Sequence, residues 1–248
     1  DGALVHDLAA NAARGADITI SLLESGPVVA DVLFNQGVAE ALAPGALFID
    51  MASIQPAEAR AHAAQLMARG AAYLDAPVSG GTVGAEAGTL AIMVGGEATD
   101  FSRAQPVFAA LGRATHVGPH GTGQLTKLAN QMIVGITIGA VAEALLLAAK
   151  GGADMAKVRE ALGGGFADSR ILQLHGQRMV ERDFAPRGRM TVQLKDMRNA
   201  LSTAQELGFD APVTALLESL YAEAVAHGLD GLDQSGLFVE LAHRNGMT

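Results

Sequence analysis

Short apolar runs alternate with alanine-rich stretches of helical periodicity through the first half of this chain of 248 residues. The apolar runs predict strands at residues 16–23, 46–50, 72–77, 90–96 and 114–117. Helical periodicity predicts helices between them at residues 27–42, 56–69 and 100–111. This alternation favours an α/β layer with a largely parallel sheet.

A single long helix is predicted over residues 122–150. It carries no proline, and at the usual rise per residue it extends over roughly 40 Å. Residues 132–149 are apolar apart from Thr137 and Glu143, so a membrane span is one interpretation. No interfacial anchors flank the stretch, which favours a helix buried in protein that joins two domains.

Beyond this helix every segment has helical periodicity. Helices are predicted at residues 154–162, 169–181, 191–207, 212–228 and 236–245. We therefore predict an α/β domain over residues 1–119 and an all-α domain over residues 120–248 that includes the long helix.

Composition narrows the class of protein. With 26 acidic against 17 basic residues, the net charge of −9 argues against a broad basic face for nucleic acid. The absence of cysteine excludes disulfides and thiolate chemistry and favours a cytoplasmic location. The chain begins at Asp1 rather than at Met and shows no signal peptide, so its start looks cut. We expect small-molecule partners, with no nucleic acid and no membrane.

Motifs of several enzyme classes are missing from the sequence. It has no H-E-x-x-H and no run of carboxylates with the spacing of a metal-binding loop, so no metal site is expected. It has no G-x-S-x-G and no P-loop, so neither a hydrolase nor a nucleotide triphosphatase is expected. The dinucleotide fingerprint G-x-G-x-x-G is absent as well. Residues 121–126, G-T-G-Q-L-T, have its first two glycines only, which favours a hinge and the start of the long helix over a pyrophosphate loop.

Two segments carry candidate chemistry. Residues 75–84, D-A-P-V-S-G-G-T-V-G, place a small-residue loop after a strand, and its N–H groups can hold a carboxylate or form an ordinary glycine-rich turn. Lys127, Asn130 and Gln131 share one helix face at spacings i, i+3 and i+4. A helical lysine usually lies in solvent, but after this one no charge follows before Glu143, which predicts a helix entering the interior.

These segments resemble a known family, the β-hydroxyacid dehydrogenases, which includes 3-hydroxyisobutyrate dehydrogenases and tartronate semialdehyde reductases. The D-A-P-V-S-G-G of residues 75–81, together with G-T-L at 88–90 and M-V-G-G at 93–96, is similar to the family's substrate-binding segment. Residues 121–131, G-T-G-Q-L-T-K-L-A-N-Q, resemble its catalytic segment, and L-K-D at 194–196 resembles a further signature. The K-L-A-N-Q is most similar to the reductase branch, since other members carry Asn where Gln131 stands.

The resemblance implies NAD(P)-dependent, reversible hydride transfer between a short β-hydroxy acid and its semialdehyde. It assigns Lys127 as the general acid/base. The implied substrate contacts are Ser79, Gly80, Gly81, Asn130 and Gln131. The implied contacts to NAD or NADP are Leu22, Leu23, Ser53 and Lys195. A Rossmann-type domain, an all-α domain and a homodimer or homotetramer are also implied.

Two departures from the family pattern limit what the resemblance implies. The family's first strand, its G-x-G-x-x-G turn, the next helix and the second strand have no counterpart, so the Rossmann-type domain looks incomplete at its N-terminus and the sequence does not choose between NAD and NADP. Gly188 stands where the reductase branch tends to have an aromatic residue, which leaves the substrate's size open. The alternatives are an imine reductase-like relative, against which Lys127 counts, and a non-catalytic dimerisation module.

Overall fold

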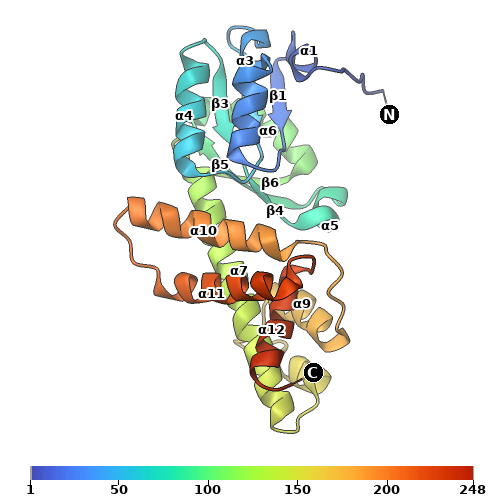
Figure 1. Ribbon diagram of the computed structural model, residues 1–248. Helices are drawn as coiled ribbons and strands as arrows, with labels where there is room; N and C mark the ends of the chain where they lie inside the picture. Colours follow the sequence, from blue (N-terminus) through green and yellow to red (C-terminus); the bar gives the residue numbers. More distant parts are fainter. Residues whose placement is uncertain (1, 248) are drawn as a thin grey trace. The chain divides into compact units, whose positions relative to one another are not determined.

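The structure is a computed structural model that describes residues 2–247 (Figure 1). The chain divides into two compact units, with the boundary between Lys127 and Leu128. This boundary lies within the long helix α7, Thr122–Lys150, whose range is the one that the sequence predicts.

The first unit contains a mixed six-stranded sheet. Its strands are β1 (Ile18–Ser21), β2 (Leu47–Asp50), β3 (Ala72–Asp75), β4 (Val78–Ser79), β5 (Leu90–Gly96) and β6 (Gly112–Gly118). The strands follow the order β1-β2-β3-β5-β4, and β6 pairs with β5. Strands β1 to β3 are parallel, as are β5 and β6, but β5 is antiparallel to β3 and β4. The sheet is therefore parallel over its first three strands and reverses where the chain turns back through β4.

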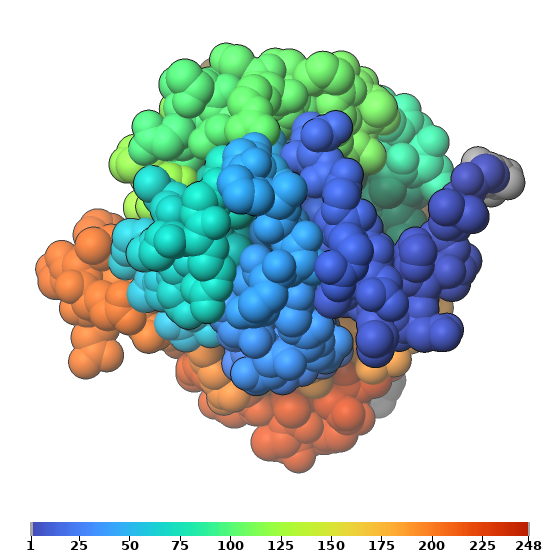
Figure 2. Space-filling view, turned by 90° about the horizontal axis from the view of Figure 1, so that it is seen from above, coloured from blue at the N-terminus to red at the C-terminus, as the bar shows by residue number. Residues whose placement is uncertain are grey.

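Helices flank this sheet. They are α1 (Ala9–Ala13), α2 (Gly26–Ala30), the π-helical turn η1 (Asp31–Asn35), α3 (Val38–Ala41), α4 (Pro56–Met67), α5 (Gly81–Glu86) and α6 (Ala98–Leu111). The single helix predicted over 27–42 is wrong, because Gly37 adopts φ +77° and separates α3 from the preceding turns. Residues 2–8 form no helix or strand, and Figure 2 shows this dark-blue segment extending from the first unit.

Alternate residues of the strands pack on opposite faces of the sheet. Phe48 and Tyr73 join a core with α2 to α4, whereas Leu47, Ile49 and Leu74 join a second core with α6. Parallel strands covered by helices on both faces form the Rossmann-type α/β architecture that the sequence predicts.

The second unit is all-α, as predicted. Besides most of α7 it contains α8 (Met155–Leu162), α9 (Arg170–Glu181), α10 (Met190–Glu206), α11 (Pro212–Ala224), the π-helical turn η2 (Val225–Leu229), the 3₁₀ turn η3 (Gln234–Gly236) and α12 (Leu237–Arg244). By length and composition α7 could cross a membrane, which is weak support for a span. Its residues Ile138, Ala142 and Leu145 are instead buried in the core of this unit.

Candidate functional site

The first three strands end side by side at one edge of the sheet. The register pairs Ser21 with Asp50, and Asp50 with Asp75, so the last residues of β1, β2 and β3 are neighbours. Ligands of open α/β sheets bind beyond the carboxyl ends of such strands. The segments that follow the three strands therefore form the candidate site of the first unit.

The predicted cofactor residues of this unit lie in two of those segments. Leu22 and Leu23 follow β1, and Leu22 is 68% exposed, so it offers an uncovered apolar surface. Ser53 follows β2 and is half-buried. An apolar side chain suits the ring of a dinucleotide and a hydroxyl suits its ribose, whereas the sequence contains no G-x-G-x-x-G for its pyrophosphate.

The carboxylate of Asp50 is fully buried beneath this edge. It accepts hydrogen bonds from Ser21 Oγ at 3.0 Å, from the Ala52 amide at 3.0 Å and from Tyr73 Oη at 3.1 Å. Burial raises the pKa of Asp50 from 3.8 to about 6, and the hydrogen bonds only partly oppose this.

We expect Asp50→Asn to reduce the dependence of stability on pH. A carboxyl pKa raised by folding contributes stability at low pH that is lost as pH rises through the folded pKa, here about 6. The rise from 3.8 to about 6 corresponds to about 3 kcal/mol. Asparagine keeps an oxygen that accepts from Ser21 and Ala52, but it does not titrate. Between about pH 4 and pH 7 the unfolding free energy of Asp50→Asn should therefore fall less than that of wild type, by about 3 kcal/mol.

Urea denaturation across this pH range measures the effect. The exposed Asp17 supplies the matched control, since Asp17→Asn removes the same charge from the surface of the same unit. Parallel stability curves for wild type and Asp50→Asn would contradict the interpretation.

The carboxylate of Asp75 caps the start of α7. Asp75 Oδ1 accepts from the Gly121 amide at 2.8 Å and Oδ2 accepts from the Gln124 amide at 2.9 Å. The first N–H groups of a helix have no partner within it, and a carboxylate there also complements the helix dipole. Burial raises the pKa of Asp75, which these two bonds oppose. Asp75 therefore fixes the helix turn that leads to Lys127.

The glycines of the G-T-G segment allow this close approach. A Cβ on Gly123 would lie 2.5 Å from the carbonyl oxygens of both Asp75 and Met93, and one on Gly121 would lie 2.9 Å from that of Pro56. Strand residues lie against Gly123, and the Pro56 carbonyl and the Arg60 side chain lie against Gly121, so both glycines make room for other parts of the protein. The segment starts α7, as the sequence predicts.

Lys127 is half-buried on α7 and interacts with other groups of the protein. One helical turn further on, Asn130 and Gln131 begin a polar network of the second unit. Asn130 Nδ2 donates to Gln131 Oε1 at 2.8 Å, and Gln131 Nε2 donates to Asp196 Oδ2 at 2.8 Å. Lys195 Nζ lies 3.4 Å from Asp196 Oδ1, and Asp196 is buried. The structure thus links the predicted residues Asn130, Gln131 and Lys195 through one carboxylate.

Asp196 determines the orientation of the Gln131 side-chain amide. A carboxylate accepts hydrogen bonds only, so the NH₂ group of Gln131 points to Asp196 and its oxygen faces Asn130. Gln193 reinforces the arrangement, because its Oε1 accepts from Gln131 Nε2 at 3.3 Å and its Nε2 donates to the backbone carbonyl oxygen of Gln131 at 3.0 Å.

The predicted carboxylate-binding residues end β4 and begin α5. Ser79 is half-buried, and Gly80 and Gly81 are exposed. Gly80 adopts φ +141° and Gly81 adopts φ +62°, which side chains disfavour. A Cβ on Gly81 would meet nothing within 4 Å, so the space beside its Cα is open. The loop predicted from sequence is thus a two-residue strand followed by a short helix.

Sequence reasoning missed the roles of Asp75 and Gln124. Both lie inside motifs that were identified in the sequence. Asp75 begins D-A-P-V-S-G-G, and Gln124 is the last residue of G-T-G-Q. Neither motif shows that the two segments meet, because they are far apart in the sequence. Gly121 and Asp75, which are hydrogen-bonded, are 46 residues apart.

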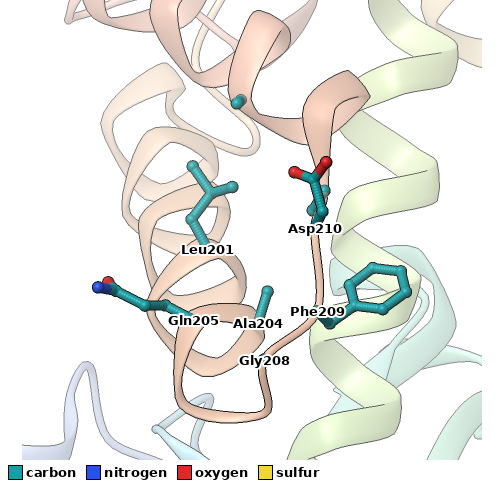
Figure 3. Close-up of a pocket in the computed structure, with 8 residues that line it drawn as sticks. Leu201, Ala204, Gln205, Gly208, Phe209 and Asp210 are labelled. Carbon is teal, nitrogen blue, oxygen red and sulfur yellow. The ribbon is translucent and has the colours of Figure 1, made fainter.

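A separate hollow lies in the second unit, outside the predicted site. Its volume is about 400 Å³, and Figure 3 shows it between the end of α10 and the loop to α11. It is lined by Leu201, Ala204, Gln205, Gly208, Phe209, Asp210, Ala211 and Ala215. None of the predicted site residues lines it. Among residues 2–247, no three His, Cys, Asp or Glu side chains gather in a way that could hold a metal ion.

Two family models match the chain. One, described as the NAD binding domain of 6-phosphogluconate dehydrogenase, matches residues 1–120. The other, described as NAD-binding of NADP-dependent 3-hydroxyisobutyrate dehydrogenase, matches residues 121–241. Together they indicate binding of NAD or NADP, as the sequence predicts.

Individual relatives agree with these models. The chain is 44% identical over 238 residues to the 2-hydroxy-3-oxopropionate reductase of Escherichia coli (strain K12), covering 95% of this chain and 82% of that protein. It is 38% identical to the 3-hydroxyisobutyrate dehydrogenase of Pseudomonas aeruginosa, covering 95% and 83%. A structure of Mycobacterium tuberculosis 3-hydroxyisobutyrate dehydrogenase with L-serine matches with a TM-score of 0.87, at 31% identity, over 95% of this chain and 83% of that one.

The alternative functions are less well supported. A reductive aminase from Aspergillus terreus is similar with a TM-score of 0.56 and 22% identity, a likeness in fold alone. A purely structural module is not favoured by relatives that are named as dehydrogenases and reductases. From its sequence motifs, its α/β and all-α units and these relatives, the chain belongs to the β-hydroxyacid dehydrogenase family and is an NAD(P)-dependent oxidoreductase of small hydroxy acids.

Proposed function

We propose that the protein reduces a short semialdehyde acid of the tartronate semialdehyde type to its β-hydroxy acid, reversibly, with Lys127 as general acid/base. The observation that carries the proposal is the Lys127, Asn130 and Gln131 face of α7, held in place by Asp75 at the helix start and by Asp196 beside Gln131. The 44% identity to a 2-hydroxy-3-oxopropionate reductase supports this substrate over the semialdehyde of 3-hydroxyisobutyrate.

The cofactor, when bound, supplies or accepts the hydride at the carbonyl carbon. We assign its contacts to Leu22, Leu23, Ser53 and Lys195. The exposed apolar side chain of Leu22 suits a flat ring, and the cationic Lys195 suits an anionic cofactor. Because the chain carries a net charge of −9, such local cations have to offset the repulsion between protein and anionic ligands.

Lys127 would hold and move the proton of the reaction. As the carbonyl oxygen gains negative charge, the ammonium group donates a proton to it, and in the reverse direction the amine accepts the proton from the hydroxyl. A charge-assisted hydrogen bond from the same group stabilises the developing oxyanion.

The remaining residues would bind and orient the substrate. The amides of the exposed residues Gly80 and Gly81, with the Ser79 hydroxyl, are suited to the substrate carboxylate. Asn130 and Gln131 would orient the hydroxyl. The NH₂ group of Gln131 donates to Asp196, so its amide oxygen, which also accepts from Asn130, would be the group that accepts from the substrate hydroxyl. A homodimer or homotetramer and a cytoplasmic location belong to the same proposal.

Steady-state kinetics with the polypeptide encoded by the full open reading frame test the proposal. Oxidation of NADH and of NADPH is followed with tartronate semialdehyde and, separately, with the semialdehyde of 3-hydroxyisobutyrate. We expect turnover with the first substrate at a kcat/KM about tenfold or more above that with the second, since pockets discriminate small groups by such factors. A protein that binds either cofactor in calorimetric titration but reduces neither semialdehyde would contradict it.

A further inference from the structure

The side chain of Gln124 joins the first turn of α7 to the segment that carries Ser53. Gln124 Oε1 accepts from the Ile54 amide at 3.1 Å, and its Nε2 donates to the Ala52 carbonyl at 2.7 Å. The two backbone groups flank Ser53 on either side. Gln124 is fully buried, and Ala52 and Ile54 are each 1% exposed, so water does not replace these bonds.

The backbone of Gln124 is held as firmly as its side chain. Its amide donates to Asp75 Oδ2 at 2.9 Å, which ties the helix turn to the end of β3. Lys127 follows three residues later on the same helix, close to one turn away. One residue thus connects the ends of β2 and β3 to the turn that precedes Lys127.

The chemistry of the contact suits glutamine. The segment offers one donor and one acceptor, and a primary amide carries both an acceptor and a donor that pair with them at once. Glutamate lacks the donor when ionised, and asparagine is one methylene shorter. A buried N–H or C=O left without a partner costs about 1 to 3 kcal/mol, so an apolar side chain here would release the segment.

We propose that Gln124 is a positioning residue that holds Ser53 in place for the cofactor relative to the Lys127 turn. This inference rests on the proposed function, which assigns Ser53 to the cofactor and Lys127 to proton transfer. Gln124 itself touches neither reactant, since both ends of its amide are engaged by backbone.

Replacing Gln124 by methionine, of similar length but without polar atoms, tests the proposal. We expect the Kd for NADH or NADPH, measured by calorimetric titration, to rise about tenfold, as loss of one or two such bonds implies. We expect kcat to fall by a similar factor, and the KM for the semialdehyde to change less than about twofold, because Ser79, Gly80 and Gly81 belong to other elements. Unchanged cofactor affinity in a folded Gln124→Met protein would overturn the proposal.

A control variant separates positioning from general destabilisation. Leu66 is fully buried in α4 of the same unit and its aliphatic side chain makes no hydrogen bond, so Leu66→Ala lowers stability without removing the two hydrogen bonds of the Gln124 side chain. We expect Leu66→Ala to keep cofactor affinity near that of wild type at a temperature where both variants are folded. An equal loss of affinity in Leu66→Ala would overturn the proposal.

Gln124→Glu supplies a second readout should the methionine variant fail to fold. An ionised glutamate keeps the bond from Ile54 but repels the Ala52 carbonyl, whereas a protonated one donates to it. The cofactor affinity of this variant, relative to wild type at the same pH, should therefore recover as pH falls from about 8 to about 5. If the ratio of the two cofactor affinities stayed constant across that pH range, the proposed role of the Gln124 side-chain bonds would be contradicted.

The two proposals fail in different ways. If Ser53→Ala and Lys127→Ala impair the enzyme while the Gln124 variants do not, the inference fails and the proposed function stands. If Ser53→Ala leaves cofactor affinity unchanged and Lys127→Ala leaves turnover unchanged, the proposed function itself is wrong.

Discussion

Lys127→Ala is expected to lower kcat about 10²- to 10⁴-fold, the range that a placed general acid contributes. Alanine has no proton to donate as negative charge develops on the carbonyl oxygen, and solvent water is a poor substitute at the same position. The half-buried side chain of Lys127 lies beyond the capped first turn of α7, so its removal leaves the contacts of Asp75 and Gln124 unchanged. The cofactor's Kd should therefore stay within about twofold of the wild-type value.

Stopped-flow or steady-state assays of cofactor oxidation measure this loss, and calorimetric titration measures the affinity. Lys150→Ala is the matched control, since Lys150 ends the same helix and donates to the Asn245 carbonyl at 3.0 Å. We expect the control to retain wild-type turnover. Turnover of Lys127→Ala at the wild-type rate would remove the lysine from the mechanism and reopen the imine reductase alternative.

Elements whose identity depends on local pattern were predictable from the sequence. The apolar run at 90–96 forms β5 over the same residues, and the proline-free stretch at 122–150 forms α7. In both, the hydrophobic pattern is long or uniform enough to outweigh local alternatives. Lys127, Asn130 and Gln131 could be placed on one face because helix periodicity alone determines it.

Features that depend on distant contacts could not be predicted. The antiparallel pairing of β5 with β3 is set by how the chain returns through β4, which no local pattern encodes. The break at Gly37 depends on a left-handed backbone conformation that glycine permits but does not require. The hydrogen bonds from Gln124 to residues 52 and 54 span 70 residues or more, so the sequence names the residue without showing its role.

Gly123→Ala is expected to have the largest effect on stability of any change in the candidate site. The added Cβ would lie 2.5 Å from the carbonyl oxygens of Asp75 and Met93 and 2.8 Å from Asp75 Oδ2. Two of these atoms are backbone in the sheet, so relief requires moving β3, β5 or the start of α7 rather than rotating a side chain. Overpacking costs about 1 to 3 kcal/mol where side chains can adjust, and we expect about 3 kcal/mol or more here.

The helix preference of alanine opposes only a small part of this cost, since it favours alanine over glycine by at most about 1 kcal/mol. Displacing α7 would also lengthen the bonds that the Gly121 and Gln124 amides donate to Asp75, so turnover should fall even in molecules that remain folded. Chemical denaturation measures the first effect and steady-state kinetics the second.

Gly231→Ala is the control for the substitution itself, because a Cβ there would meet nothing within 4 Å. We expect it to change the unfolding free energy by less than about 0.5 kcal/mol, as surface substitutions do. If Gly123→Ala were as stable and active as Gly231→Ala, α7 would not be seated against Asp75 and Met93 as closely as the structure places it. The positioning of Lys127 through this contact would then have to be abandoned, whereas a large loss confined to Gly123→Ala supports it.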